Sequence, residues 1–165
     1  MIKIKDLKKY FGSKHILRGV NLDIKDGEVT TIIGGSGTGK STLIKCIIRL
    51  LEPDGGEILV NGKDITHVTG KELRAAREKL QIVFQDPYSS LNPRLRIEST
   101  IMEPLKQSGR FKNKEEMKAE ANRLMELVGI DKRMMHAYPH ELDGGRRQRI
   151  GIARALSLGP KMIVC

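Results

Sequence analysis

The segment "GGSGTGKST", residues 34–42, combines the residue types that bind phosphate. It completes the pattern G-x-x-x-x-G-K-[ST] through Gly34, Gly39, Lys40 and Ser41. The glycines let backbone N–H groups turn toward one point, and a helix that starts after the loop adds the positive end of its dipole. The Lys40 ammonium suits the β- and γ-phosphates of a nucleotide, and the Ser41 hydroxyl suits Mg²⁺. The candidate phosphate-binding residues are Gly34, Gly35, Ser36, Gly37, Thr38, Gly39, Lys40, Ser41 and Thr42.

The segments on either side of this loop are those that a phosphate-binding loop requires. The run "EVTTIIGG", residues 28–35, follows the turn signal "KDGE" and predicts a strand that enters the loop. Residues 40–51 predict a helix with an apolar face that leaves it. The alternative is a glycine-rich turn that only joins a strand to a helix, and such a turn has no use for Lys40 followed by Ser41.

The remaining periodicity predicts a mainly α/β chain that a helical block interrupts. Alternation of apolar and polar side chains predicts strands in residues 1–7 and 16–24, and a hairpin in residues 57–65 that turns at Asn61 and Gly62. Further strands are predicted in residues 78–86 and in the run "MIVC", residues 162–165. Helices are predicted over residues 71–80, 114–128 and 144–156, the second with an apolar stripe at Met117, Ala121, Leu124, Met125 and Val128.

The charge of the chain favours an anionic partner. Thirty basic and twenty acidic residues give a formal net charge of +10, and the alternative interpretation is a solvated basic surface. Three tyrosines, three phenylalanines and no tryptophan are scattered along the chain, so no aromatic platform for single-stranded nucleic acid is predicted. Nucleic acid is therefore a weak hypothesis, and no direct nucleic-acid contact is expected.

Cysteine and histidine positions do not predict a metal site. Cys46 and Cys165 lie far apart without ligand spacing, which favours a reducing, cytoplasmic compartment. His136 and His140 have the spacing of one helical turn, but Pro139 separates them and favours a loop. No apolar run approaches the roughly 20 residues that span a bilayer, so a membrane role would require a partner.

The segment "HELDGGRRQRIGIARAL", residues 140–156, resembles the signature segment of ATP-binding cassette (ABC) proteins. The family's common form is Leu-Ser-Gly-Gly-Gln, followed by a basic residue, a glutamine and another basic residue. Asp143 and Arg146 depart from it, because they occupy the serine and glutamine positions. Two glycines before a helix are also a common cap, so specificity comes from the combination with the loop at 34–42. The matching residues are Leu142, Gly144, Gly145, Arg147, Gln148 and Arg149.

Two further positions are similar to the family pattern. Gln85 follows a predicted strand, where the family's Q-loop glutamine contacts Mg²⁺ or water and senses the transporter subunit. Phe11 lies where the family usually has an aromatic ring that stacks on adenine, with Tyr10 as the neighbouring candidate. A surface glutamine and a strand-end core aromatic are the alternatives. The stretch "FQDPYSSLNPRLRIESTIMEPL", residues 84–105, resembles the oligopeptide, dipeptide and nickel importer branch.

The resemblance covers residues 2–165 and implies a fold, cofactors and partners. The implied fold is a P-loop NTPase (RecA-like) core with an antiparallel β-subdomain and an α-helical subdomain, incomplete at its C-terminus. Its parts are residues 1–85 with Walker A and the Q-loop, the helical residues 86–145, and residues 146–165 with the signature helix and the start of the Walker B strand. Implied cofactors are ATP, and Mg²⁺ held by Ser41 and Gln85. Implied partners are transmembrane permease subunits at the inner face of the cell membrane, and a second nucleotide-binding subunit in a head-to-tail dimer, whose ATP would meet Asp143, Gly144 and Gly145.

The resemblance also yields an expectation about hydrolysis. In the family, a run such as "MIVC" leads into the Walker B Asp and the Glu that polarises the attacking water, and a switch His follows. These residues would lie beyond Cys165. We therefore expect this chain to bind nucleotide but to be deficient in the ATP hydrolysis typical of the full-length family. Two functions stay open: the ATP-binding subunit of an importer of peptides or nickel, and a soluble cassette protein that uses ATP-driven dimerisation without transport.

Overall fold

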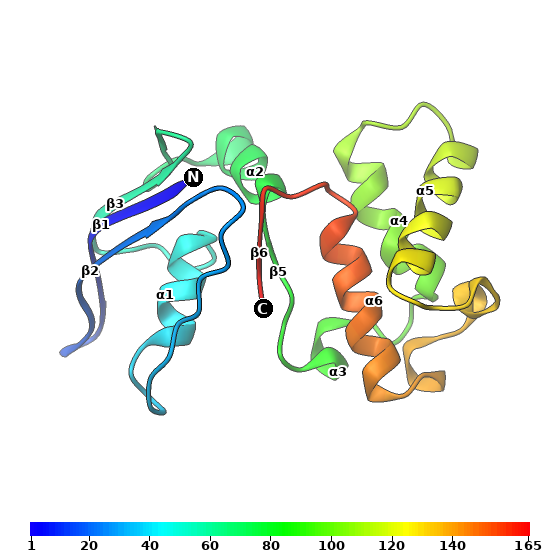
Figure 1. Ribbon diagram of the computed structural model, residues 1–165, viewed down its shortest axis with the longest axis horizontal. Helices are drawn as coiled ribbons and strands as arrows, with labels where there is room; N and C mark the ends of the chain where they lie inside the picture. The colour runs from blue at the N-terminus through cyan, green and yellow to red at the C-terminus, as the bar shows by residue number, and fades with distance from the viewer. The chain divides into compact units, whose positions relative to one another are not determined.

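The computed structural model describes the backbone of residues 1–165 and every side chain except those of Pro87 and Ser89. The chain divides into two compact units, residues 1–77 and residues 78–165 (Figure 1). The division at residues 85 and 145 that the sequence suggested stays a prediction.

The first unit contains an antiparallel sheet in the order β2-β1-β3-β4, of which Figure 1 labels β1, β2 and β3. Its strands are β1 (Ile2–Phe11), β2 (Lys14–Ile24), β3 (Gly55–Val60) and β4 (Lys63–Asp64). The strand predicted in residues 1–7 is confirmed by β1, where Ile2 and Ile4 are buried, but its alternation breaks at a register shift between Ile4 and Leu7, where Asp6 has a φ of 48° and Leu7 is buried. Asn61 and Gly62 have positive φ angles of 51° and 80°, as a tight two-residue hairpin turn requires, so this predicted turn is also confirmed.

Helix α1 (Lys40–Ile47) begins within the segment 34–42, directly after Gly39. Helix α2 (Gly70–Lys79) ends at the start of the second unit. The prediction of a helix over residues 40–51 is wrong beyond Ile47. Arg49 adopts a left-handed conformation with φ 58°, and the N–H groups of Leu50 and Leu51 both donate to the Lys45 carbonyl, at 2.8 and 3.0 Å. This is a Schellman-type C-cap, in which the left-handed residue Arg49 turns the backbone away from the helix axis and ends the helix.

Residues 28–35 differ from their prediction, because they form no strand in the described backbone. Val29 and Ile33 are 92% and 89% exposed. A strand is defined by its ladder of hydrogen bonds, and neither described sheet supplies a neighbour to this segment. The predicted strand is therefore wrong in this structure, because the local pattern could not indicate whether a partner strand was present.

The second unit begins with a parallel pair of strands, β5 (Leu80–Ile82) and β6 (Met162–Val164). The Val83 N–H extends the pairing by donating to the Val164 carbonyl at 2.8 Å. The strand predicted over residues 78–86 is therefore too long, because Glu78 and Lys79 still belong to α2 and the residues after 83 lead into α3. The strand predicted in residues 162–165 is confirmed over Met162–Val164, and Cys165 lies outside it.

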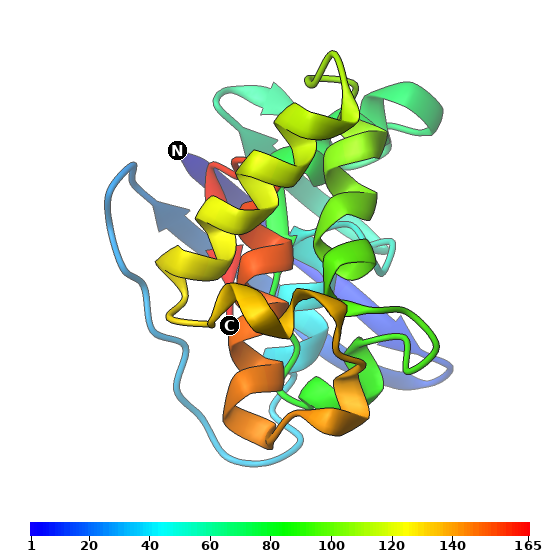
Figure 2. The ribbon, with the colours of Figure 1, turned by 90° about the vertical axis from the view of Figure 1, so that its right-hand side faces the viewer.

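Helices make up the rest of the second unit, and α4, α5 and α6 pack side by side (Figure 2). The elements are α3 (Pro87–Ser90), α4 (Ile97–Ser108), α5 (Lys114–Leu127), η1 (Lys132–His136), η2 (Pro139–Glu141) and α6 (Gly144–Leu156). Asn113 caps α5 by accepting a hydrogen bond from the Glu116 N–H at 2.8 Å. The predicted stripe of α5 is confirmed, since its members lie in or against the core. That core holds Leu91, Ile97, Ile101, Leu105, Ala121, Leu124, Met125, Ile130, Met135, Leu142, Ile150 and Ala153.

Two features of the described residues bear on the class of protein. None of the described helices has the length and hydrophobicity needed to cross a membrane. No cluster of three or more His, Cys, Asp and Glu side chains suited to a metal ion occurs among the described residues. His136 ends η1 and His140 lies in η2, so the two histidines belong to separate short turns.

Candidate functional site

The loop at residues 34–42 borders a cavity of about 280 Å³ at the start of α1. Loop backbone, the first turn of α1 and side chains from β1 and β2 enclose it. Such a volume lies near the lower end of the range usual for small-molecule sites, about 300–1,000 Å³. The lining residues are Phe11, Ile16, Ser36, Gly37, Thr38, Gly39, Lys40, Ser41 and Thr42.

Gly39 fixes the entry of the loop into α1. Its φ of 92° is left-handed, and a Cβ at this position would lie 3.0 Å from Ile16 Cγ2 and 3.2 Å from Leu17 Cδ2. A larger residue would therefore strain the backbone and press on β2 at once. No acidic residue occupies the first turn of α1, so the positive end of its dipole is not neutralised there. The result is a helix N-terminus that presents N–H groups to the cavity.

Lys40 lies folded over the loop. Its ammonium donates hydrogen bonds to the carbonyl oxygens of Gly34 and Gly35, at 2.7 and 2.6 Å. The Thr38 hydroxyl donates to the Gly35 carbonyl at 3.0 Å. These contacts pin the curl of the loop and keep a positive charge at the mouth of the cavity. Since the ammonium carries three donors on a flexible stem, it can turn from the carbonyls toward an anion.

The aromatic residues at the end of β1 have different surroundings. Phe11 is 49% exposed and lines the cavity, with the Lys9 ammonium 5.8 Å from its ring centroid. Tyr10 instead stacks on His15, with ring centroids 4.0 Å apart. Of the two candidates that the sequence left open, only Phe11 lines the described cavity, so its ring is the one available for a planar ligand.

Ile16 is a lining residue that sequence reasoning missed. Its side chain forms part of the cavity wall, although it belongs to β2 and lies far from the loop in sequence. The alternation of β2 assigns Ile16 to one face of the strand, but only the folded sheet shows which face meets the loop. No signal in the sequence could have identified it.

The signature residues form the start of α6 in the second unit. Asp143 caps the helix, because its Oδ1 accepts a hydrogen bond from the Arg146 N–H at 2.8 Å. The Arg146 Nε lies 3.4 Å from Asp143 Oδ2. That backbone hydrogen bond lowers the pKa of the Asp143 carboxyl, and the Arg146 guanidinium lowers it further. Gly144 and Gly145 are exposed, so the first turn of α6 is open to a ligand or partner.

Gln85 is an exposed residue just beyond the parallel strand pair, also in the second unit. Asp86 follows it and caps α3, since its Oδ1 accepts a hydrogen bond from the Tyr88 N–H at 2.8 Å. The structure therefore places Gln85 and Asp143 in one unit, and Phe11 with the loop at 34–42 in the other. The predicted Mg²⁺ roles of Ser41 and Gln85 stay predictions.

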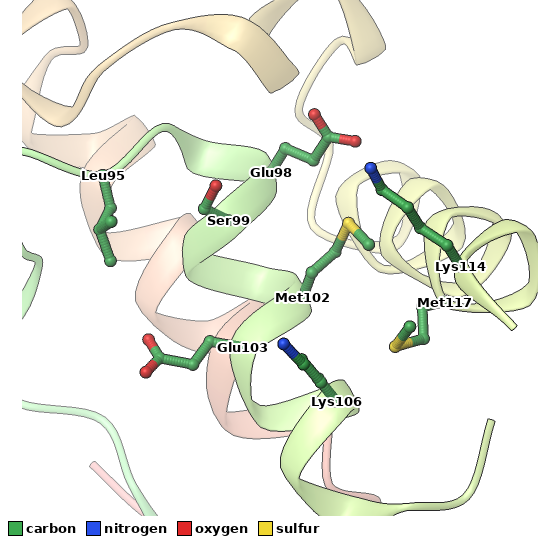
Figure 3. A pocket seen from close by; sticks show the side chains of 8 residues that line it. All are labelled: Leu95, Glu98, Ser99, Met102, Glu103, Lys106, Lys114 and Met117. Carbon is green, nitrogen blue, oxygen red and sulfur yellow. The ribbon is translucent and has the colours of Figure 1, made fainter.

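A second cavity, of about 630 Å³, lies between α4 and α5 (Figure 3). Leu95, Met102 and Met117 give it an apolar surface, and carboxylate and ammonium groups of both signs border it: Glu98, Glu103, Lys106 and Lys114. It is the larger of the two, but no glycine lines it, and the helices that begin beside it carry acidic residues in their first turns, Glu98 in α4 and Glu115 and Glu116 in α5, which disfavour phosphate. The chemistry of the smaller cavity therefore makes it the candidate nucleotide site.

A glycine-rich loop that opens a helix, in a chain of mixed α/β structure, is typical of a P-loop nucleotide-binding protein. Comparison with known families makes the assignment specific. The sequence profile of the ABC transporter family matches residues 17–165, and the chain belongs to this family.

Curated relatives confirm the predicted importer branch. The dipeptide transport ATP-binding protein DppF of Lactococcus lactis subsp. cremoris (strain MG1363) is 42% identical, over 99% of this chain and 55% of the relative. The oligopeptide transport ATP-binding protein AppF of Bacillus subtilis (strain 168) is 40% identical, over 99% of this chain and 53% of the relative. The chain thus spans about half the length of these relatives.

Solved structures confirm the predicted fold class. A dimeric structure of MJ0796, a bacterial ABC transporter cassette, superposes with a TM-score of 0.89 and 34% identity, covering 99% of this chain and 72% of that one. A post-hydrolysis dimer of MJ0796 bound to ADP and Pi gives a TM-score of 0.88 and 33% identity, with the same coverage.

Proposed function

We propose that the chain is the ATP-binding part of an ABC importer subunit, which couples ATP binding and hydrolysis to the uptake of peptides. The observation that carries the proposal is the shared cavity of Phe11 and the loop at 34–42, because one wall offers an aromatic face and the other a phosphate-binding backbone. A nucleotide needs both. The names of the relatives, which include a glutathione import protein, favour peptide uptake over a role without transport.

Each residue has a definite task in this proposal. The loop backbone and the Lys40 ammonium hold the β- and γ-phosphates, the Ser41 hydroxyl and Gln85 hold Mg²⁺, and Phe11 stacks on the adenine. Mg²⁺ suits these oxygen donors, since it keeps several waters and takes few protein ligands. Asp143, with Gly144 and Gly145, faces the nucleotide of a second subunit in a head-to-tail dimer. Permease subunits hold the assembly at the inner face of the membrane.

Titration calorimetry with Mg-ATP tests this function. Lys40→Ala should weaken binding by about tenfold or more, because a charge-assisted hydrogen bond contributes about 1.5–3 kcal/mol. Lys45→Ala is the matched control, since Lys45 is an exposed lysine of the same helix that does not line the cavity. Equal dissociation constants for the wild type and the Lys40→Ala variant would overturn the proposal.

A further inference from the structure

Arg147 is a buried cation in the second turn of α6, with 9% of its surface exposed. Its guanidinium carbon lies 3.8 Å from the centroid of the Tyr88 ring. Its Nε is buried and makes no hydrogen bond, and no carboxylate pairs with it among the side chains that the structure describes. The Tyr88 ring is therefore the contact that compensates this charge.

Burying a charge without a partner is unfavourable, and the negative face of an aromatic ring offsets part of that cost. The planar guanidinium suits this contact because it can lie flat on the ring, which an ammonium cannot do. Tyr88 itself is 67% exposed, so the apolar core does not hold its ring. The two side chains thus depend on each other: the ring covers the cation, and the cation orders the ring.

A second arginine of α6 fixes the same short helix. Arg154, two turns further along, donates a hydrogen bond from Nη1 to the Ser90 carbonyl at 2.5 Å. Burial lowers the pKa of the Arg154 guanidinium, as expected for a cation away from water. Leu91, the next residue after α3, is buried in the helical core. Helix α6 therefore holds α3 at Tyr88 through one arginine and at Ser90 through another.

The segment that carries Gln85 lies between two fixed points. On one side, the Val83 N–H donates to the Val164 carbonyl at 2.8 Å. On the other side, Tyr88 stacks on Arg147. Gln85 is exposed within this span of four residues, 84–87, so the position of its backbone follows from the two ends.

We propose that Arg147 and Tyr88 are positioning residues that hold the Gln85 segment against α6, so that Gln85 and the signature residues at the start of α6 keep a fixed relation. The proposal deepens the proposed function and rests on it for the role of Gln85. A methionine at position 147 would fill much of the same space without a buried charge, and such replacements are often neutral or stabilising. Because Arg147 is buried without an ion pair among the described residues and its charge faces the Tyr88 ring, it points to positioning rather than to stability.

Backbone ¹⁵N relaxation of the full chain, without nucleotide, tests the positioning. In the wild type, the amides of residues 84–88 should have order parameters near the rigid value of about 0.85, and in Tyr88→Leu they should fall below about 0.6. The amides of α5 should not change. The Arg147 Nε–H resonance should also lose its upfield ring-current shift in Tyr88→Leu.

Matched variants show whether the contact between Arg147 and the Tyr88 ring is what orders residues 84–88. Tyr88→Phe keeps the aromatic face and should behave like the wild type. Arg147→Met should lower the order parameters of residues 84–88 without lowering the melting temperature. Arg147→Lys keeps the charge but should also give lower order parameters than the wild type. If Arg147→Met does not fold, Tyr88→Leu still decides, because this side chain is mostly exposed. Unchanged order parameters in Tyr88→Leu, or equal loosening throughout residues 78–165, would overturn the proposal.

Calorimetric titration with Mg-ATP shows whether a negative result overturns the positioning role or the proposed function. A wild type that does not bind Mg-ATP overturns the proposed function, whatever the relaxation data show. A wild type that binds Mg-ATP, together with unchanged relaxation in Tyr88→Leu, overturns the positioning role alone.

Discussion

Asp143 and Arg146 are joined twice at the start of α6, through the Arg146 N–H at 2.8 Å from Oδ1 and through the guanidinium Nε at 3.4 Å from Oδ2. The carboxylate thus serves its own helix as a cap and lies beside a positive charge. In a head-to-tail dimer, this carboxylate would face the γ-phosphate held by the other subunit. Arg146 offsets part of the repulsion, but an ionised carboxylate cannot donate a hydrogen bond to phosphate.

We expect Asp143→Ser to raise the ATP-dependent dimer fraction measured by light scattering. A serine still caps the helix, supplies a donor and removes the negative charge. Asp143→Asn is the matched control for charge, because asparagine is also a good cap, and it should raise the fraction as well. Arg146→Ala should lower it, since the carboxylate then lacks its neighbouring cation. Equal dimer fractions in all four proteins would show that the repulsion has no effect.

Phe11→Ala should weaken Mg-ATP binding and leave the binding of inorganic triphosphate unchanged. Stacking of a base on an aromatic ring contributes about 1–3 kcal/mol, which corresponds to a loss of about five- to 150-fold. Tyr10→Ala is the control, because Tyr10 stacks on His15 and does not line the cavity. Calorimetric titrations with both ligands measure the difference. An equal loss for ATP and triphosphate would contradict stacking on the base.

Local chemistry predicted those parts of the fold that depend on neighbours in sequence. The turn at Asn61 and Gly62, the stripe of α5 and the start of α6 at Gly144 follow from backbone preferences and periodicity. Residues 28–35 show where local prediction fails, since their pattern predicts a strand but they pair with neither described sheet. A strand requires a partner that its own sequence does not specify. The end of α1 is another such failure, because it depends on a left-handed arginine.

The candidate site shows the same division. The loop at 34–42 could be predicted because its backbone N–H groups form the candidate phosphate site, and the spacing of its glycines indicates the backbone conformation that this requires. The contact between Arg147 and Tyr88 could not, since the two residues lie far apart in sequence and each alone is typical of a surface. The wall that Ile16 contributes to the cavity depends on the packing of β2 in the same way.

The ion pair of Asp131 and Arg133 should make stability depend on pH in the acid range. Hydrogen bonds from the Arg133 side chain and backbone lower the pKa of Asp131 from 3.8 to about 2. Because the folded-state pKa lies below the unfolded value, this stabilisation is complete above pH 3.8 and is lost as pH falls toward 2. The advantage in melting temperature over Asp131→Asn should therefore shrink in that range.

An NMR titration of the Asp131 carboxyl carbon checks the assignment directly. Its midpoint should be about 2 in the wild type and should return toward 3.8 in Arg133→Ala. Arg123→Ala is the control, because Arg123 pairs with Glu120 on α5 and does not contact Asp131. A midpoint near 3.8 in the wild type would refute the pairing.

The left-handed conformation of Arg49 yields the last prediction. Its side chain is buried, and its Nε donates to the Ile65 carbonyl at 2.9 Å, while its own carbonyl accepts a hydrogen bond from Arg77 Nη2 at 2.5 Å. A φ of 58° is unfavourable for any residue with a Cβ, by about 1–2 kcal/mol, whereas glycine adopts it freely. The side chain and the backbone therefore have opposite effects on stability at this position.

Two substitutions separate these effects in urea unfolding. Arg49→Ala keeps the strained backbone and leaves the Ile65 carbonyl without its donor, so it should lower the free energy of unfolding by about 1–3 kcal/mol. Arg49→Gly loses the same hydrogen bond but relieves the strain, and it should be more stable than Arg49→Ala by about 1 kcal/mol. If the alanine variant equals the glycine variant, the backbone of residue 49 is not strained. If both equal the wild type, the buried hydrogen bond from Arg49 Nε contributes nothing to the free energy of unfolding, and the backbone hydrogen bonds at the end of α1 hold it without this side chain.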